Sequence, residues 1–76
     1  MRTKNISLLA WLKTASDDQV AKTGTSRGYL RLIAYGHKTA SAEIAAGVER
    51  ETGGVVTRQD LRPHDWKQIW PELSAA

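Results

Sequence analysis

The chain has 76 residues, with 11 Lys and Arg, 8 Asp and Glu, and a formal net charge of +3. Its length predicts a single domain over residues 1–76 with a small core. It has no cysteine, which excludes disulfides and thiolate metal sites and fits a reducing compartment. The N-terminal apolar run at residues 6–12 is too short for a signal-peptide core or a membrane span. We therefore expect a soluble cytoplasmic protein that does not bind a membrane.

Two helices are predicted in the first third of the chain. Apolar residues recur at helical spacing over residues 6–14, after Asn5 or Thr3 as a possible cap, and their Leu and Trp face is expected to pack on the core. Ser16 and the two aspartates after it form a capping cluster, because carboxylates suit the positive end of a helix. They predict a second, short helix over residues 17–23.

Two more helices follow. Gly24 supplies a sharp turn, and Thr25 or Ser26 caps a helix that runs to Tyr35 and stops at Gly36. After a polar connection, Ser41 caps a fourth helix, which carries Ile44, Ala45 and Val48 inward and ends at Gly53 and Gly54. We expect these four helices to form the core, over residues 5–54.

Residues 55–73 are predicted to be a C-terminal packing segment. Thr57 with Asp60 gives a cap-like start for a single turn, and Pro63 can open another. One side of this segment is strongly apolar, with Trp66, Ile69, Trp70 and Leu73. Three interpretations are open: the tryptophans fold back onto the first helix near Trp11, they contact another protein, or they form a homodimer contact.

The third predicted helix lies in the most basic part of the chain. Residues 19–42 contain four Lys and Arg and no acidic residue. Leu30 and Ile33 fall on the inward stripe of this helix, and the opposite side carries Ser26, Arg27, Arg31 and Tyr35. These are groups that contact phosphates and base edges, so double-stranded DNA is the leading partner.

Nine residues are candidates for DNA contact. Helix-start hydroxyls and backbone N–H groups hold phosphates, a guanidinium gives two donors to a guanine edge, and a glycine permits close backbone approach. Tyrosine hydroxyls and basic groups past the helix end can bind the flanking backbone. The candidates are Thr25, Ser26, Arg27, Gly28, Tyr29, Arg31, Tyr35, His37 and Lys38. The alternatives are that Tyr29 is a core aromatic, that His37 is a solvated loop residue, and that the arginines form a solvated helix face.

Catalysis finds no support in the sequence. There is no cysteine, His37 and His64 are far apart, and no HExxH, GxSxG or phosphate-loop motif is present. We therefore expect neither an enzyme nor a bound cofactor or metal.

Four segments carry a resemblance to a known family: GTSRGYLRLIAYG, SAEIAAGVERETGG, VVTRQDLRP and IWPEL. They resemble small phage and prophage repressors of the Cro-like, YdaS-type kind over about residues 24–73. The resemblance implies a λ-repressor-like DNA-binding domain, control of transcription and an antitoxin-like regulator. It also places Thr25, Ser26, Arg27, Gly28 and Arg31 on the recognition helix.

The helix before the turn departs from the family pattern. Gln19 and Val20 stand where a Leu-Ala pair is usual, so we expect that helix to be shorter, shifted or less firmly packed.

The sequence thus predicts a compact all-α fold of four to five helices with a helix-turn-helix. Its predicted function is sequence-specific recognition of double-stranded DNA by a transcriptional regulator, with residues 26–35 in the major groove. We expect a homodimer on a two-fold operator. The alternative is an antitoxin that covers a toxin with its Trp66/Trp70 segment, and single-stranded RNA binding is a weaker third interpretation.

Overall fold

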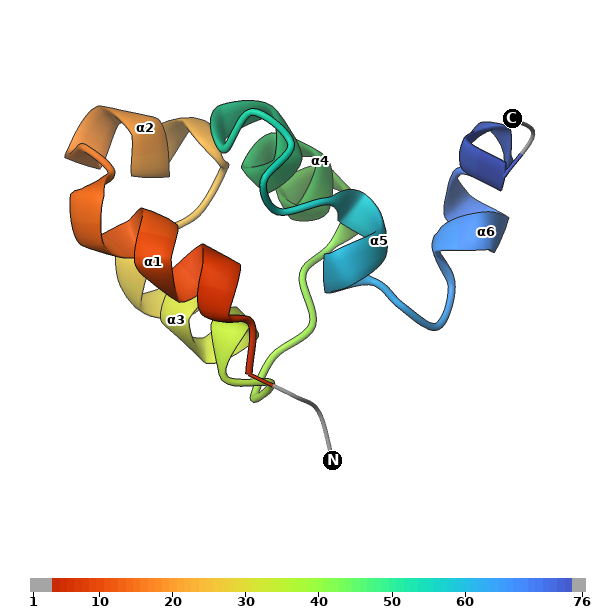
Figure 1. The fold of residues 1–76 in the computed structure, drawn as a ribbon, viewed down its shortest axis with the longest axis horizontal. Coiled ribbons are helices and arrows are strands. Elements are labelled where there is room, and N and C mark those ends of the chain that lie inside the picture. Colours follow the sequence, from red (N-terminus) through yellow and green to blue (C-terminus); the bar gives the residue numbers. More distant parts are fainter. Residues whose placement is uncertain (1–3, 75–76) are drawn as a thin grey trace.

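The computed structural model describes residues 4–74, and these residues form helices and no strand. The helices are α1 (Ile6–Thr14), α2 (Asp17–Lys22), α3 (Arg27–Ala34), α4 (Ala42–Glu51), α5 (Arg58–Leu61), α6 (Trp66–Ile69) and the 3-10 helix η1 (Pro71–Ser74) (Figure 1). The radius of gyration of 11.7 Å is close to the ~11.4 Å expected for a compact chain of this length. The expected all-α class is confirmed, and the short α6 brings the α-helices among the described residues to six.

Side-chain caps define where these helices begin. Asn5, Ser16, Ser26, Ser41 and Thr57 each accept the backbone N–H three residues ahead. Of the two predicted caps of α3, Thr25 and Ser26, it is Ser26 that caps the helix. Asn5 caps α1, and the other candidate, Thr3, lies outside the described residues. Ser16 of the predicted capping cluster caps α2 and forms a capping box with Gln19, whose side chain accepts the Ser16 N–H at 3.0 Å, while Asp17 and Asp18 lie in the first turn of the helix.

Glycines end α2 and α3, as predicted. Gly24 has a φ of 100° and Gly36 a φ of 83°, a left-handed conformation that other residues adopt only at a cost. After Gly36 the backbone N–H of His37 returns to the Leu32 carbonyl at 2.8 Å, which satisfies an end carbonyl of α3. The segment after α3 therefore leaves the helix in a defined direction.

The core is formed mainly by α1, α3 and α4. Its buried apolar residues are Leu8, Leu12, Ala15, Val20, Leu30, Ile33, Ala34, Ala40, Ala45, Val48, Val56 and Leu61. Helix α1 packs on α3, and α4 packs on both α2 and α5 (Figure 1). The inward positions predicted for α3 and α4 are confirmed, with Ile44 half-buried against the core. Helix α2 has six residues, which meets the expectation of a short helix. Its Val20 is buried, so the alternative of looser packing at this residue is wrong.

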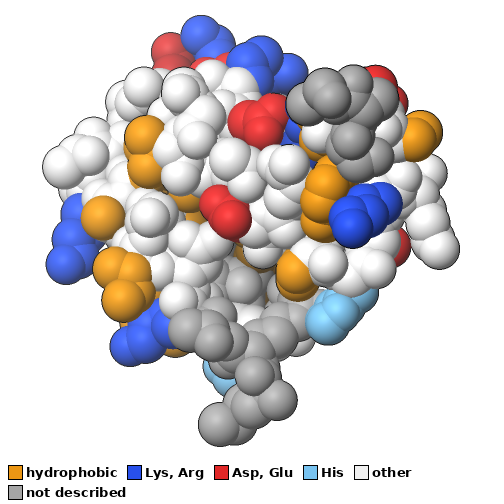
Figure 2. All heavy atoms as spheres, turned by 45° about the vertical axis from the view of Figure 1, so that its right-hand side comes forward, with side chains coloured by type: hydrophobic (Ala, Val, Ile, Leu, Met, Phe, Trp, Pro, Cys, Tyr) orange, Lys and Arg blue, Asp and Glu red, His pale blue; other side chains and the backbone are white. Residues whose placement is uncertain are grey.

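One of the three predicted courses of the C-terminal segment, in which it folds back onto the first helix, is not the one observed. Figure 1 shows α6 and η1 beyond α5, on the side of the molecule away from α1. Trp70 packs against the core, and the Arg58 guanidinium lies 5.2 Å from the centre of its ring. Trp66 is half-buried. Figure 2, which brings this side forward, shows hydrophobic side chains in small groups between basic and polar ones.

Candidate nucleic-acid interface

The turn between α2 and α3 exposes the start of α3. Thr23 ends α2, Gly24 turns the chain, and the exposed Ser26 accepts the Tyr29 N–H at 3.2 Å. Thr25, between them, is half-buried. The first N–H groups of any helix have no partner within the helix, and together with hydroxyls they attract anions. Thr25 and Ser26 therefore stand where a phosphate could bind.

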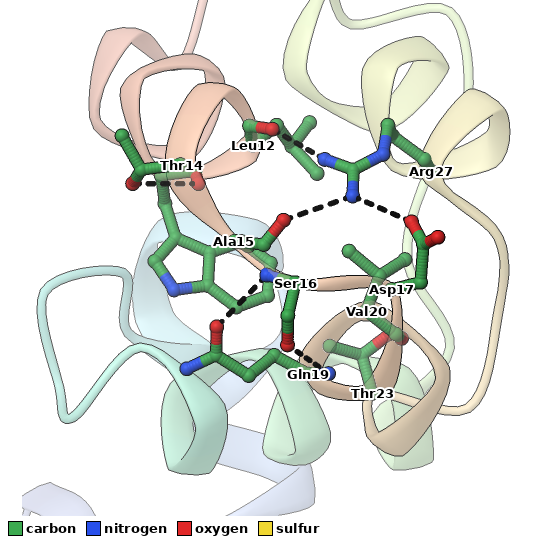
Figure 3. A network of polar contacts seen from close by, with 10 residues as sticks. Leu12, Thr14, Ala15, Ser16, Asp17, Gln19, Val20, Thr23 and Arg27 are labelled. Atoms are coloured by element: carbon green, nitrogen blue, oxygen red, sulfur yellow. Dashed lines mark hydrogen bonds and ion pairs between the residues drawn. The ribbon is translucent and has the colours of Figure 1, made fainter.

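Arg27, at the start of α3, is half-buried and bonds to α1 and to the start of α2. Its guanidinium donates to the carbonyl of Leu12, to the carbonyl of Ala15 at 2.9 Å and to the carboxylate of Asp17 at 3.1 Å (Figure 3). The two carbonyls belong to the C-terminal end of α1, where a positive charge is favoured by the helix dipole. With these internal partners Arg27 has a structural role, and the base-reading candidate that stays exposed is Arg31.

The outward face of α3 follows from its periodicity. Successive residues are separated by about 100° around the helix axis, and the buried Leu30, Ile33 and Ala34 mark the inward side. The residues on the opposite side are exposed, with Leu32 at 40% and Tyr35 at 48% of their maximal accessible surface. This face, the α3 outward face from here on, consists of Gly28, Arg31, Leu32 and Tyr35.

The other three predicted site residues flank this face. Tyr29 is half-buried and packs against the core, as expected if it is a core aromatic residue. His37 and Lys38 are exposed just past α3, and the ring of His37 lies 6.5 Å from that of Tyr35. The structure therefore brings His37 beside the α3 outward face and gives Tyr29 a packing role.

A groove between α1 and α3 adds cations that the sequence did not identify as site residues. It has a volume of about 430 Å³, and its lining includes Lys4, Lys13, Arg31 and Tyr35 above apolar residues of α1. The ammonium group of Lys4 lies 5.5 Å from the centre of the Tyr35 ring. No acidic residue lines the groove. The sequence does not single out Lys4 and Lys13, because their place next to Arg31 depends on how α1 packs against α3. Leu32 lies beside Arg31 on α3 itself, but an apolar side chain gives no signal of a nucleic-acid contact.

Residues 4–74 offer neither a metal site nor a membrane span. No group of three or more His, Asp or Glu is placed to hold a metal ion within this part of the chain. None of its helices has the length and apolarity needed to cross a membrane.

Comparison with known proteins identifies the family of the chain. No protein-family model matches the chain. A prophage transcriptional regulatory protein of Escherichia coli K12 is 41% identical over 51 residues, which span 67% of this chain and 77% of the relative. The chain belongs to the family of this prophage regulator. The relative's name describes a regulator of transcription and not an enzyme.

Proposed function

We propose that this member of the prophage regulator family is a sequence-specific double-stranded DNA-binding regulator of transcription. In this proposal α2, the turn at residues 23–26 and α3 form a helix-turn-helix of the λ-repressor-like, Cro-like (YdaS-type) kind, in a single domain over residues 1–76. Helix α3 enters the major groove, which is wide enough to admit a helix.

Gly28 is the observation that carries the proposal. A glycine inside a helix costs about 1 kcal/mol relative to alanine. A Cβ built on Gly28 meets no atom within 4 Å beyond its chain neighbours and the backbone of its own helix, and Gly28 is not among the glycines with positive φ. Neither packing nor backbone conformation requires a glycine here. Its position on the α3 outward face leaves close approach of an external partner as the reason for it.

The charge around Gly28 indicates what that partner is. Arg31 lies on the same face, Lys4 and Lys13 lie along the neighbouring groove, and residues 19–42 contain no acidic residue. In this proposal, Thr25, Ser26 and the first N–H groups of α3 bind one phosphate. Tyr35, His37 and Lys38 bind the DNA backbone beyond the other end of α3. Phosphate contacts fix the register of a DNA-binding protein, and contacts to base edges give its specificity. We assign the base contact to Arg31, whose guanidinium can give two donors to guanine.

One helix of eight residues covers only part of an operator. We therefore propose that the protein binds as a homodimer on a two-fold site, as small helix-turn-helix proteins do when each subunit reads half of it. The proposal requires no cofactor.

Fluorescence anisotropy with DNA from the region upstream of the protein's own gene tests this function. A scrambled duplex of equal composition is the reference, at low and near-physiological salt. We expect tighter binding to the native duplex at both salts, and loss of that preference in Arg31→Ala. Lys67→Ala is the matched control, because it removes one positive charge from an exposed position on α6, far from α3 in Figure 1. Equal affinity for both duplexes, or loss of binding in both variants alike, would reject sequence-specific recognition by α3.

The second candidate is an antitoxin-type protein contact through the Trp66/Trp70 segment. It is favoured by the half-burial of Trp66, Ile69 and Leu73 on an arm that stands beyond α5. Against it, Trp70 is engaged by Arg58, and the apolar side chains of this side are scattered in Figure 2. If this candidate is right, Trp66→Ala abolishes partner binding in a pull-down with a co-expressed toxin, and Arg31→Ala leaves it intact.

A further inference from the structure

Leu32 is an exposed apolar side chain in the middle of a basic surface. The other aliphatic side chains of α3, those of Leu30, Ile33 and Ala34, are buried, whereas Leu32 keeps 40% of its surface accessible. A single exposed leucine is common on protein surfaces and indicates nothing by itself. Here, however, it stands on the α3 outward face beside Arg31 and one turn after Gly28.

Gly28 and Leu32 are spaced so that they form a small apolar surface, which consists of the Gly28 backbone and the Leu32 methyl groups. Residues four apart lie one above the other on a helix, and side chains lean toward the N-terminus, so Leu32 leans over the turn of Gly28. Apart from its two chain neighbours and the backbone of its own helix, no protein atom lies within 4 Å of the place where a Cβ of Gly28 would be. A flat partner can therefore reach the backbone at Gly28 and the methyl groups of Leu32 at the same time.

Only one group in the major groove suits an apolar contact with this surface. Base edges present donors and acceptors there, and thymine alone adds a methyl group. A leucine pressed against polar edges would remove water from them without replacing its hydrogen bonds, which is unfavourable. Against a thymine methyl it buries apolar surface and leaves no polar group unpaired.

Building on the proposed function, we infer that Leu32 reads the 5-methyl group of a thymine in each half-site, next to the base pair contacted by Arg31. The contact makes this position of the operator specific for a methylated pyrimidine. It adds to the binding site a residue that the charge pattern of the chain does not identify.

The test removes the two partners of the contact separately: the thymine methyl group from the DNA and the Leu32 side chain from the protein. The wild-type protein first selects duplexes from a random-sequence pool, and the enriched duplex is then synthesised with uracil replacing each thymine in turn. We expect one thymine in each half-site at which uracil weakens binding by about fourfold, the effect of burying one methyl group. Leu32→Ala binds the thymine and uracil duplexes equally at that position. Val55→Ala, which shortens an apolar side chain exposed at 63% outside α3, keeps the wild-type difference.

The outcomes separate this inference from the function on which it rests. Circular dichroism first verifies that Leu32→Ala is folded, as expected for a side chain with so much of its surface in solvent. Enrichment of a sequence whose thymines all tolerate uracil would overturn the methyl contact while leaving the DNA function in place. The same would follow if Leu32→Ala kept the fourfold difference. A pool that yields no enriched sequence would overturn the proposed function itself, and the inference with it.

Discussion

The backbone of Gly47 lies directly against the backbone of Thr23, where α4 crosses the end of α2. A Cβ on Gly47 would stand 2.5 Å from the Thr23 carbonyl oxygen and 3.1 Å from its Cα. Thr23 is itself buried, and its hydroxyl donates to the Val20 carbonyl at 2.6 Å. This contact fixes the last residue before the turn and therefore the point from which the chain enters α3.

Gly47→Ala is expected to destabilise the protein. Alanine favours a helix over glycine by about 1 kcal/mol, but here the added methyl group meets backbone, which cannot move aside as a side chain can. Overpacking of this kind costs typically ~1–3 kcal/mol, so we expect a net loss measured as a lower urea midpoint. An unchanged or higher midpoint would show that α2 and α4 can separate freely at this crossing.

Gly28→Ala should have the opposite effect on stability. The new methyl group meets nothing within 4 Å, so the helix gains about 0.5–1 kcal/mol from the better helix former. If α3 approaches DNA at Gly28, the same variant binds the operator more weakly while being more stable. Urea unfolding and fluorescence anisotropy on one preparation measure both quantities. A more stable variant with unchanged DNA affinity would remove the main support for close approach at this position.

Arg27→Ala should lower the stability of the free protein. The side chain is 29% exposed and donates to two carbonyls of α1, and hydrogen bonds made by charged groups are worth about 1.5–3 kcal/mol. Asp17→Ala is the matched control, because its carboxylate is fully exposed and solvent screens its ion pair with Arg27, so we expect the smaller loss of stability in this variant. Thermal unfolding of both variants without DNA separates the two contributions. Equal losses would mean that the ion pair, and not the carbonyl contacts, is the important interaction.

The helix boundaries were predictable because the signals that set them are local. Ser16, Ser26, Ser41 and Thr57 cap the helices that start next to them, and Gly24 and Gly36 stop the helices that end there. Each of these interactions spans only a few residues. The amphipathic pattern of α3 likewise identified Leu30 and Ile33 as inward residues.

The direction of individual side chains was not predictable in the same way. The sequence treats Arg27 and Arg31 as equivalent, being four apart on one helix, yet Arg27 reaches the carbonyls of Leu12 and Ala15. Those carbonyls become available only where the end of α1 meets the start of α3. The neighbourhood of Lys13 and Arg31 depends on the same packing.

The course of the C-terminal segment depends on two arginines in a similar way. Arg58 pairs with Glu49 of α4 at 2.9 Å and lies over Trp70, while Arg62 donates to the Ala40 carbonyl and to both carboxylate oxygens of Asp65. The apolar spacing of residues 66–73 showed that this segment has a face to bury. The spacing alone leaves open which part of the protein this apolar face packs against. In the structure the segment lies beside α5 and is held by Arg58 and Arg62, and it does not lie on α1.

The Arg62–Asp65 pair makes the stability of the protein sensitive to acid. The hydrogen bonds from Arg62 lower the pKa of Asp65 from its ordinary value of 3.8. A carboxyl whose pKa is lowered by folding stabilises the native state at all pH values above its unfolded pKa, and this contribution is lost as the pH falls through the lowered value. Asp65→Asn removes the titrating group. We therefore expect the variant to be less stable than the wild type at neutral pH, and the difference to shrink below about pH 4. Urea midpoints of both proteins from about pH 7 down to about pH 2 measure this, and a difference independent of pH would show that the pair does not contribute through its charge.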